Sequence, residues 1–168
     1  SDEIRKGVRE AILKLKELGV KKIVMLTGDN EIAAKKIADE VLVDEFKANL
    51  MPEDKVKYLE QSPYKGKGLV MVGDGVNDSA ALALSDVGIA MGEIGSDSAI
   101  EASDITLMKD DFREIPKIIE LAKKTIKVSR QDFYIWGFSN AAGLILVFAG
   151  IIGPAGAAAY NFLTDFLP

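Results

Sequence analysis

The sequence of 168 residues contains no cysteine and no histidine. Disulfides and zinc sites built from Cys and His are therefore excluded for this segment, and no imidazole can act as a general base. Carboxylates, amides, hydroxyls and lysines must carry any chemistry. Basic residues are in the minority, with 21 Lys and Arg against 26 Asp and Glu, and the formal net charge is −5. This balance disfavours a nucleic-acid partner, because no basic stripe can neutralise phosphates, and it suits a cation or magnesium-phosphate chemistry better.

Charge is missing from one long stretch, since residues 133–164 contain no Lys, Arg, Asp or Glu. Phe133 to Ile152 supplies about 20 uncharged positions, enough to cross a hydrocarbon core of ~30 Å at ~1.5 Å per residue. Gly153-Pro154-Ala155-Gly156 predicts a turn, and Ala157 to Leu167 predicts a return helix. We therefore expect a transmembrane helical hairpin over residues 131–168, with its second helix truncated. The alternative is a helical hairpin buried in a larger soluble protein.

Basic residues at positions 123, 124, 127 and 130 precede the first predicted span. By the positive-inside rule they predict that residues 1–130 lie in the cytoplasm, and the uncharged stretch predicts an integral membrane protein. The sequence has no initiator Met and no signal-peptide pattern, and it ends in an apolar stretch. We expect it to be a fragment of a longer chain.

Residues 1–130 alternate predicted helices with predicted strands. A helix capped by Ser1 or Asp2 should run to Gly19, and apolar runs near residues 22–26, 45–48, 68–72, 87–91 and 104–108 predict strands. Helical patterns separate these runs, and a last helix should begin near Asp111. This alternation is typical of an α/β fold, a parallel sheet with helices on both faces.

Polar segments follow two of the predicted strands directly. They are Thr27-Gly28-Asp29-Asn30 and Gly73-Asp74-Gly75-Val76-Asn77-Asp78. The carboxyl ends of parallel strands gather at one edge of a sheet, where ligands bind. Carboxylates close together repel one another unless a cation holds them, so the second segment predicts a Mg²⁺ site. Taken singly, the same residues fit an ordinary glycine turn and an acidic helix N-terminus.

Together with Pro52-Glu53-Asp54-Lys55, these two segments resemble, in order and spacing, the P-type cation-transporting ATPases. The resemblance continues through Ala80 to Gly92 and through Gly95 to Asp104. It implies a haloacid-dehalogenase-like fold and a phosphorylation domain over residues 1–130. It also implies ATP hydrolysis coupled to cation transport through an aspartyl phosphate, with the lipid bilayer and the rest of the same ATPase chain as partners.

The resemblance assigns four residues to the transferred phosphoryl group. Thr27 would hydrogen-bond a phosphoryl oxygen, and Lys55 would neutralise phosphoryl charge. Gly28 and Asp29 would complete the loop beside this group. Positioned charge of this kind is the main source of catalysis when phosphoryl transfer is metaphosphate-like.

Five further residues would form the magnesium part of the site. Asp74 would ligate Mg²⁺ together with Asp78, while Asn77 and Asp78 would hold the phosphate and the aspartate-metal network. Gly73 and Gly75 would let the backbone approach the ligand closely. ATP itself would be bound mainly by a domain outside this chain.

The family's nucleophile lies in an Asp-Lys-Thr-Gly motif, and this tetrapeptide does not occur in the sequence. The segment alone therefore cannot form an aspartyl phosphate by the family's route, and its sheet should lack its first strand. If the chain were complete, a non-catalytic membrane-tethered module that binds Mg²⁺ or a partner would explain the missing motif. A soluble haloacid-dehalogenase-type phosphatase is the third reading, against which the uncharged stretch argues.

The single predicted hairpin and the segment Gly95 to Glu101 are similar to the heavy-metal-transporting subgroup. The transported ion would then be a heavy or transition metal. Asn140 and Asp165 are polar residues within the predicted membrane helices, so both are candidates for the ion path. The alternative is that Asn140 bonds a neighbouring helix and that Asp165 lies near the membrane surface.

Overall fold

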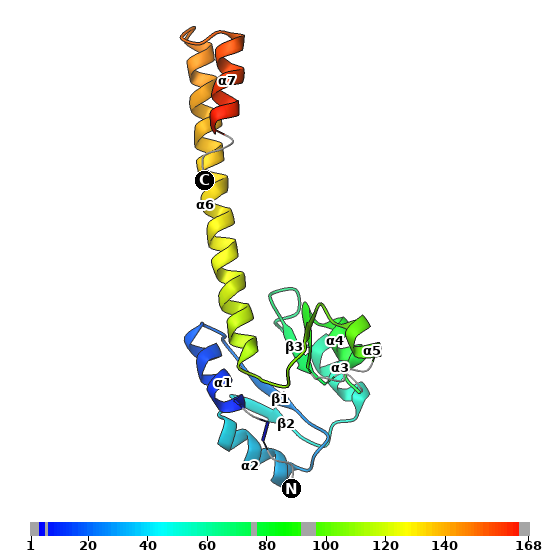
Figure 1. The fold of residues 1–168 in the computed structure, drawn as a ribbon. Coiled ribbons are helices and arrows are strands. Elements are labelled where there is room, and N and C mark those ends of the chain that lie inside the picture. The colour runs from blue at the N-terminus through cyan, green and yellow to red at the C-terminus, as the bar shows by residue number, and fades with distance from the viewer. Residues whose placement is uncertain (1–3, 6, 75–76, 92–96, 165–168) are drawn as a thin grey trace. The chain divides into compact units, whose positions relative to one another are not determined.

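The computed structural model describes residues 4–5, 7–74, 77–91 and 97–164. The chain divides into two compact units, residues 1–117 and residues 118–168, and each is described by itself. The first unit contains all strands that the described residues form (Figure 1). They are β1 (Val24–Leu26), β2 (Glu45–Lys47), β3 (Val70–Gly73), β4 (Val87–Met91) and β5 (Ile105–Leu107).

Helices separate these strands, as the sequence predicts. They are α1 (Val8–Glu17), α2 (Glu31–Val41), α3 (Pro52–Glu60), α4 (Ser79–Leu84) and α5 (Asp97–Ala102), and α6 (Glu114–Phe148) begins at the end of the unit. Helix α2 packs against β2, and α4 packs against both β3 and β4. The expected α/β architecture is therefore confirmed.

The strands form two parallel sheets, and the prediction of a single sheet is wrong for the described residues. β1 pairs with β2 in one sheet, while β3, β4 and β5 follow in this order in the other. A sheet is continuous only where neighbouring strands exchange hydrogen bonds. Among the described strands β1 and β3 exchange none, so the sheet is interrupted between them.

An aspartate precedes three of the strands and fastens each of them to its neighbour. The backbone N–H of the aspartate donates to a carbonyl near the start of the neighbouring strand, and the carboxylate accepts the N–H of the same residue. The three pairs are Asp44 with Ile23, Asp86 with Leu69 and Asp104 with Gly88, and each side-chain bond is 2.8 Å long. The amino-terminal ends of the strands are thus held together at the edge opposite the polar segments.

Two of these carboxylates have shifted acidity. Backbone N–H groups, first that of Leu69 and then that of Gly66, lower the pKa of Asp86. The ammonium of Lys16, followed by the N–H of Ile23, lowers the pKa of Asp44. Both carboxylates are therefore stabilised in the charged form that accepts these bonds.

The core of the first unit lies where α3 and α4 cover the larger sheet. Leu59, Met71, Ala81, Leu82 and Ala90 form one buried cluster. A second group of small side chains lies where α1 packs against α2, and it consists of Ala11, Ala34 and Ala38. Alanines at this contact let the two helix backbones approach closely.

Helix α1 begins later than predicted. It starts at Val8 after Gly7, which has a left-handed φ of 79°, and the helix has no side-chain cap. The expected caps, Ser1 and Asp2, lie outside the described residues. A Cβ at Gly7 would lie 2.7 Å from Cγ of Arg113, so both the backbone conformation and this contact favour glycine.

The second unit contains the rest of α6 and the helix α7 (Pro154–Thr164). α7 folds back beside the end of α6 (Figure 1), and the Tyr160 hydroxyl donates a 2.9 Å bond to the Ser139 carbonyl. Pro154, expected in the turn, is instead the first residue of α7, a position where its missing N–H costs nothing.

No helix in the described part of the chain combines the length and the apolar composition that a membrane crossing requires. The predicted hairpin is present as two helices with a turn between them. Its predicted crossing of a membrane stays a prediction.

Candidate functional site

Lys55 and Asp78 form a largely buried ion pair at the carboxyl end of β3. Pro52 opens α3, and the Asp54 carboxylate accepts the N–H of Met51, so Lys55 is fixed in the first turn. Its Nζ donates to Oδ1 of Asp78 at 2.7 Å, and the two side chains are only 15% and 11% exposed. Asp78 is the only buried polar residue in the described part of the chain. Two predicted site residues, separate in sequence, are thus brought together.

Gly73 makes this arrangement possible. It is the last residue of β3, and a Cβ added there would lie 2.8 Å from Oδ2 of Asp78. Any larger residue would displace the Asp78 carboxylate from its place. The glycine is therefore required for close approach of a neighbouring side chain. Its predicted role beside a bound ligand stays a prediction.

Asp74, the next residue, is exposed and lies beside a cationic side chain. Nη2 of Arg5 is 3.4 Å from Oδ2 of Asp74, and Nη1 of Arg5 donates to Oδ1 of Asp110 at 3.0 Å. Sequence reasoning missed Arg5 and Asp110, because each one alone fits a solvated surface charge. No local pattern could have joined them.

Thr27 and Asp29 form a tight polar turn after β1. The Thr27 hydroxyl donates to Oδ2 of Asp29 at 2.8 Å and accepts the Asp29 N–H at 3.1 Å. The segment after β2 supports this turn, because the Leu50 N–H donates to the Thr27 carbonyl at 3.0 Å. A Cβ at Gly28 would lie 3.3 Å from the Leu50 carbonyl oxygen.

The two groups of predicted residues lie on different sheets. Among the described residues, no hydrogen bond or ion pair links the Thr27 turn to the Lys55–Asp78 pair. Asn77 is exposed. Gly75 and Asp165, also predicted as site residues, lie outside the described part of the chain.

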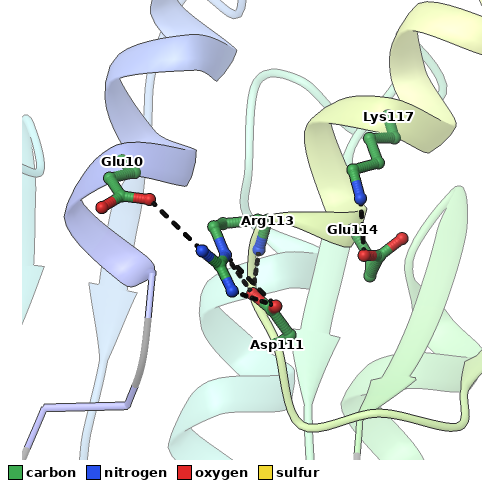
Figure 2. Close-up of polar contacts among 5 residues, drawn as sticks. All are labelled: Glu10, Asp111, Arg113, Glu114 and Lys117. Atoms are coloured by element: carbon green, nitrogen blue, oxygen red, sulfur yellow. Dashed lines mark hydrogen bonds and ion pairs between the residues drawn. The ribbon is translucent and has the colours of Figure 1, made fainter.

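Arg113 ties the start of α6 to α1 (Figure 2). Its guanidinium holds the Asp111 carboxylate at 2.7 Å and lies 3.9 Å from Oε2 of Glu10. The bonds from Arg113 also place the pKa of Asp111 well below its usual range. Lys117 and Glu114 form a further pair, at 2.7 Å, one turn along α6.

The residues present fit a magnesium ion whose remaining coordination positions are filled by other ligands. Each predicted metal carboxylate lies next to a side-chain cation, Asp74 next to Arg5 and Asp78 next to Lys55. Both positions therefore favour positive charge. Within the described ranges, no group of three or more acidic, His or Cys side chains could hold a metal by itself. Mg²⁺ in proteins commonly uses one or two carboxylates and takes its other oxygens from water and phosphate.

In the second unit, Asn140 borders a small cavity between α6 and α7. The cavity has a volume of about 160 Å³, and Tyr160 and Asn161 also line it. The Asn140 amide donates to the Trp136 carbonyl of its own helix at 2.8 Å. This bond lies within α6. The alternative to an ion-path role for Asn140 was a bond to a neighbouring helix.

Comparison with known proteins gives one matching family. The model of the haloacid dehalogenase-like hydrolases matches residues 1–86. Among solved structures, a zinc-transporting PIB-type ATPase in its E2.Pi state is 38% identical, with a TM-score of 0.86 over 98% of this chain and 27% of that chain.

Two curated relatives extend this similarity. A probable cadmium-transporting ATPase of Listeria monocytogenes is 41% identical over 89% of this chain and 21% of its own length. A manganese-exporting P-type ATPase of Mycobacterium leprae is 42% identical over 94% of this chain and 22% of its own length. The predicted similarity to heavy-metal P-type ATPases is confirmed. The chain spans about a fifth of the length of these curated relatives.

Proposed function

Since the chain belongs to the haloacid dehalogenase-like hydrolase family, we propose that it supplies the magnesium and phosphate site of an ATP-driven metal-cation transporter. The transporter would work through an aspartyl phosphate and move a heavy or transition metal. The buried Lys55–Asp78 pair beside Gly73 carries this proposal, because it concentrates fixed charge at the end of a parallel strand. Relatives named as cadmium and manganese ATPases favour a transporter over a phosphatase or a tethered binding module.

The phosphate-facing residues act by position and charge. Lys55, fixed by Asp78, neutralises an oxygen of the transferred phosphoryl group. The Thr27 hydroxyl, which now donates to Asp29, can turn its proton to a phosphoryl oxygen, while the Asp29 N–H keeps donating to it and holds it in place. Asn77 is exposed and free of the buried core, so its amide can donate to the same group.

Asp74 and Asp78 would hold Mg²⁺ through their carboxylate oxygens. The metal, when bound, neutralises charge that develops on the transferred phosphoryl group. Asp78 keeps its place through Lys55, and Asp74 is open to solvent, so a hydrated cation can reach it.

The nucleophilic aspartate would come from a strand that this chain does not contain. The sheet is interrupted between β1 and β3; β1 is followed directly by Thr27, and β3 ends at Gly73. One further parallel strand in this place would join the two sheets. It would also present its carboxyl end between the Thr27 turn and the Lys55–Asp78 pair. ATP would be bound mainly by a separate domain.

Residues 1–130 would form the cytoplasmic part, and residues 131–168 would lie in the bilayer with the remaining helices of the protein. Large apolar side chains on the described part of α6 support this placement, since Phe133, Phe138 and Phe148 are 67%, 80% and 87% exposed. Asn140 and Asp165 remain the candidates for the path of the transported cation.

ATP hydrolysis by the full-length protein, measured with a panel of heavy and transition metals, tests the function. We expect stimulation by at least one metal and loss of turnover in Asp74→Asn and in Asp78→Asn. Asp39→Asn, an exposed carboxylate on α2, is the control for the loss of one charge and should keep its activity. Full metal-stimulated activity in both site variants would refute the assignment.

A further inference from the structure

We propose that Arg5 is an internal counter-ion of Asp74 that Mg²⁺ must displace, and that Asp110 keeps the guanidinium when the metal binds. The inference rests on the proposed function, in which Asp74 is a magnesium ligand. In this proposal Arg5, a residue of the amino-terminal segment, affects how tightly the site binds Mg²⁺.

The geometry gives Arg5 two partners of unequal strength. One nitrogen lies 3.4 Å from Asp74, and the other lies 3.0 Å from Asp110. Charge-assisted N–H···O bonds are typically about 2.7–2.9 Å long, so the contact with Asp74 is the weaker of the two. A guanidinium can hold two carboxylates at once through its separate nitrogens. Arg5 can therefore release Asp74 and stay paired with Asp110.

Mg²⁺ and the guanidinium compete for the same carboxylate. An oxygen that accepted both would bring two positive groups close together, which Coulomb repulsion opposes. The three side chains are between 40% and 55% exposed, so the guanidinium can move without unpacking the core. Nearby contacts keep the segment in place, because Gly7 packs against Arg113 and Glu10 faces its guanidinium.

The Lys55–Asp78 pair is not expected to exchange in this way. Its bond is shorter, at 2.7 Å, and its side chains are mostly buried. The two carboxylates of the proposed site are thus held differently. Lys55 occupies Oδ1 of Asp78 and leaves Oδ2 for the metal, so Asp78 can keep its cation, whereas the cation beside Asp74 can be replaced.

Direct Mg²⁺ binding to the nucleotide-free, full-length protein tests the proposal. Displacement of bound Mn²⁺ by Mg²⁺, followed by electron paramagnetic resonance, gives the affinity without turnover. Because exposed ion pairs are weak, we expect Arg5→Gln to tighten Mg²⁺ binding about two- to five-fold. Arg9→Gln removes the same charge from an exposed position on α1 and should leave the affinity unchanged. Unchanged or weaker binding in Arg5→Gln would overturn the proposal.

Asp110→Asn provides a test of opposite sign. Without Asp110 the guanidinium has only Asp74, so Mg²⁺ binding should weaken about two-fold. In the Arg5→Gln background the same change should have no effect. An equal loss in both backgrounds would mean that Asp110 acts through its own charge, and the proposed exchange would be wrong.

The Asp74→Asn variant distinguishes failure of the counter-ion role of Arg5 from failure of the proposed magnesium site. If Asp74→Asn abolishes Mg²⁺ binding while Arg5→Gln leaves it unchanged, the counter-ion role fails and the magnesium site stands. If Asp74→Asn binds Mg²⁺ normally, the magnesium site itself is wrong, and the role of Arg5 falls with it.

Discussion

The Lys55–Asp78 pair should contribute to folding as a coupled unit. We consider Lys55→Met, Asp78→Asn and the double variant. Each single change leaves one charge, or one hydrogen-bonding group, without its partner in a site that is only 11–15% exposed. The double change removes both, so its cost should be smaller than the sum of the single costs.

The size of the effect follows from burial. Breaking a fully buried ion pair from one side costs about 3–5 kcal/mol. Because both side chains retain some exposure, we expect about 2–3 kcal/mol for Lys55→Met. The double-mutant coupling should be about 1–3 kcal/mol. Gly73, which leaves room for the Asp78 carboxylate, is unchanged in all variants.

Urea unfolding in detergent solution, followed by circular dichroism, measures the four free energies of unfolding. Helix α3 offers a matched control in Lys57 and Asp54, a pair 3.6 Å apart whose side chains are 66% and 42% exposed. Its coupling should not exceed ~0.5 kcal/mol. If the two pairs gave equal couplings, burial would not be what makes the Lys55–Asp78 pair strong, and the reasoning would be wrong.

Two further variants test the packing and the electrostatics of the first unit. Gly88→Ala should destabilise the protein by about 1–3 kcal/mol in thermal unfolding, because its Cβ would lie 2.8 Å from the Leu82 carbonyl oxygen. Gly137→Ala, whose Cβ would meet no side chain or other element within 4 Å beyond its own helix backbone and chain neighbours, is the control and should be neutral or stabilising by up to ~1 kcal/mol. Glu45 is paired with two lysines, which lower its pKa from 4.5 to about 2. The stability that the charged carboxylate gives to the folded state is therefore complete above pH 4.5 and is lost as the pH falls through about 2. Acid unfolding should therefore show a flatter loss of stability in Glu45→Gln over this pH range, and equal slopes would contradict the shift.

The strands were predictable because their signals are local. The run Val87–Met91 is a strand over the predicted residues, and β1 lies within the predicted 22–26. The start of α1 was not predictable in the same way, because capping residues are common at chain ends. The feature that fixes it, Gly7 against Arg113, joins positions far apart in sequence. Continuity of the sheet depends likewise on which strands are present, not on the pattern within each one.

The site residues at strand ends were predictable from position, and one helix residue was not. Thr27 directly follows β1, and Gly73 is the last residue of β3. Lys55 was identified only through a resemblance, since a single lysine in the first turn of a helix usually points to solvent. Its burial against Asp78 depends on how α3 packs relative to β3, and no periodicity within α3 contains that information.

Arg5 and Asp110 show where sequence reasoning reaches its limit. They are 105 positions apart, and neither belongs to a motif. Yet the Arg5 guanidinium contacts both Asp110 and Asp74, a predicted metal ligand. Coulomb energies depend on distance in space, so the partners of a charge are known only after the fold is known. The motif therefore predicts which carboxylates could hold a cation. The tertiary structure adds which side-chain cation lies beside Asp74, and so which cation a metal would have to displace under our proposal.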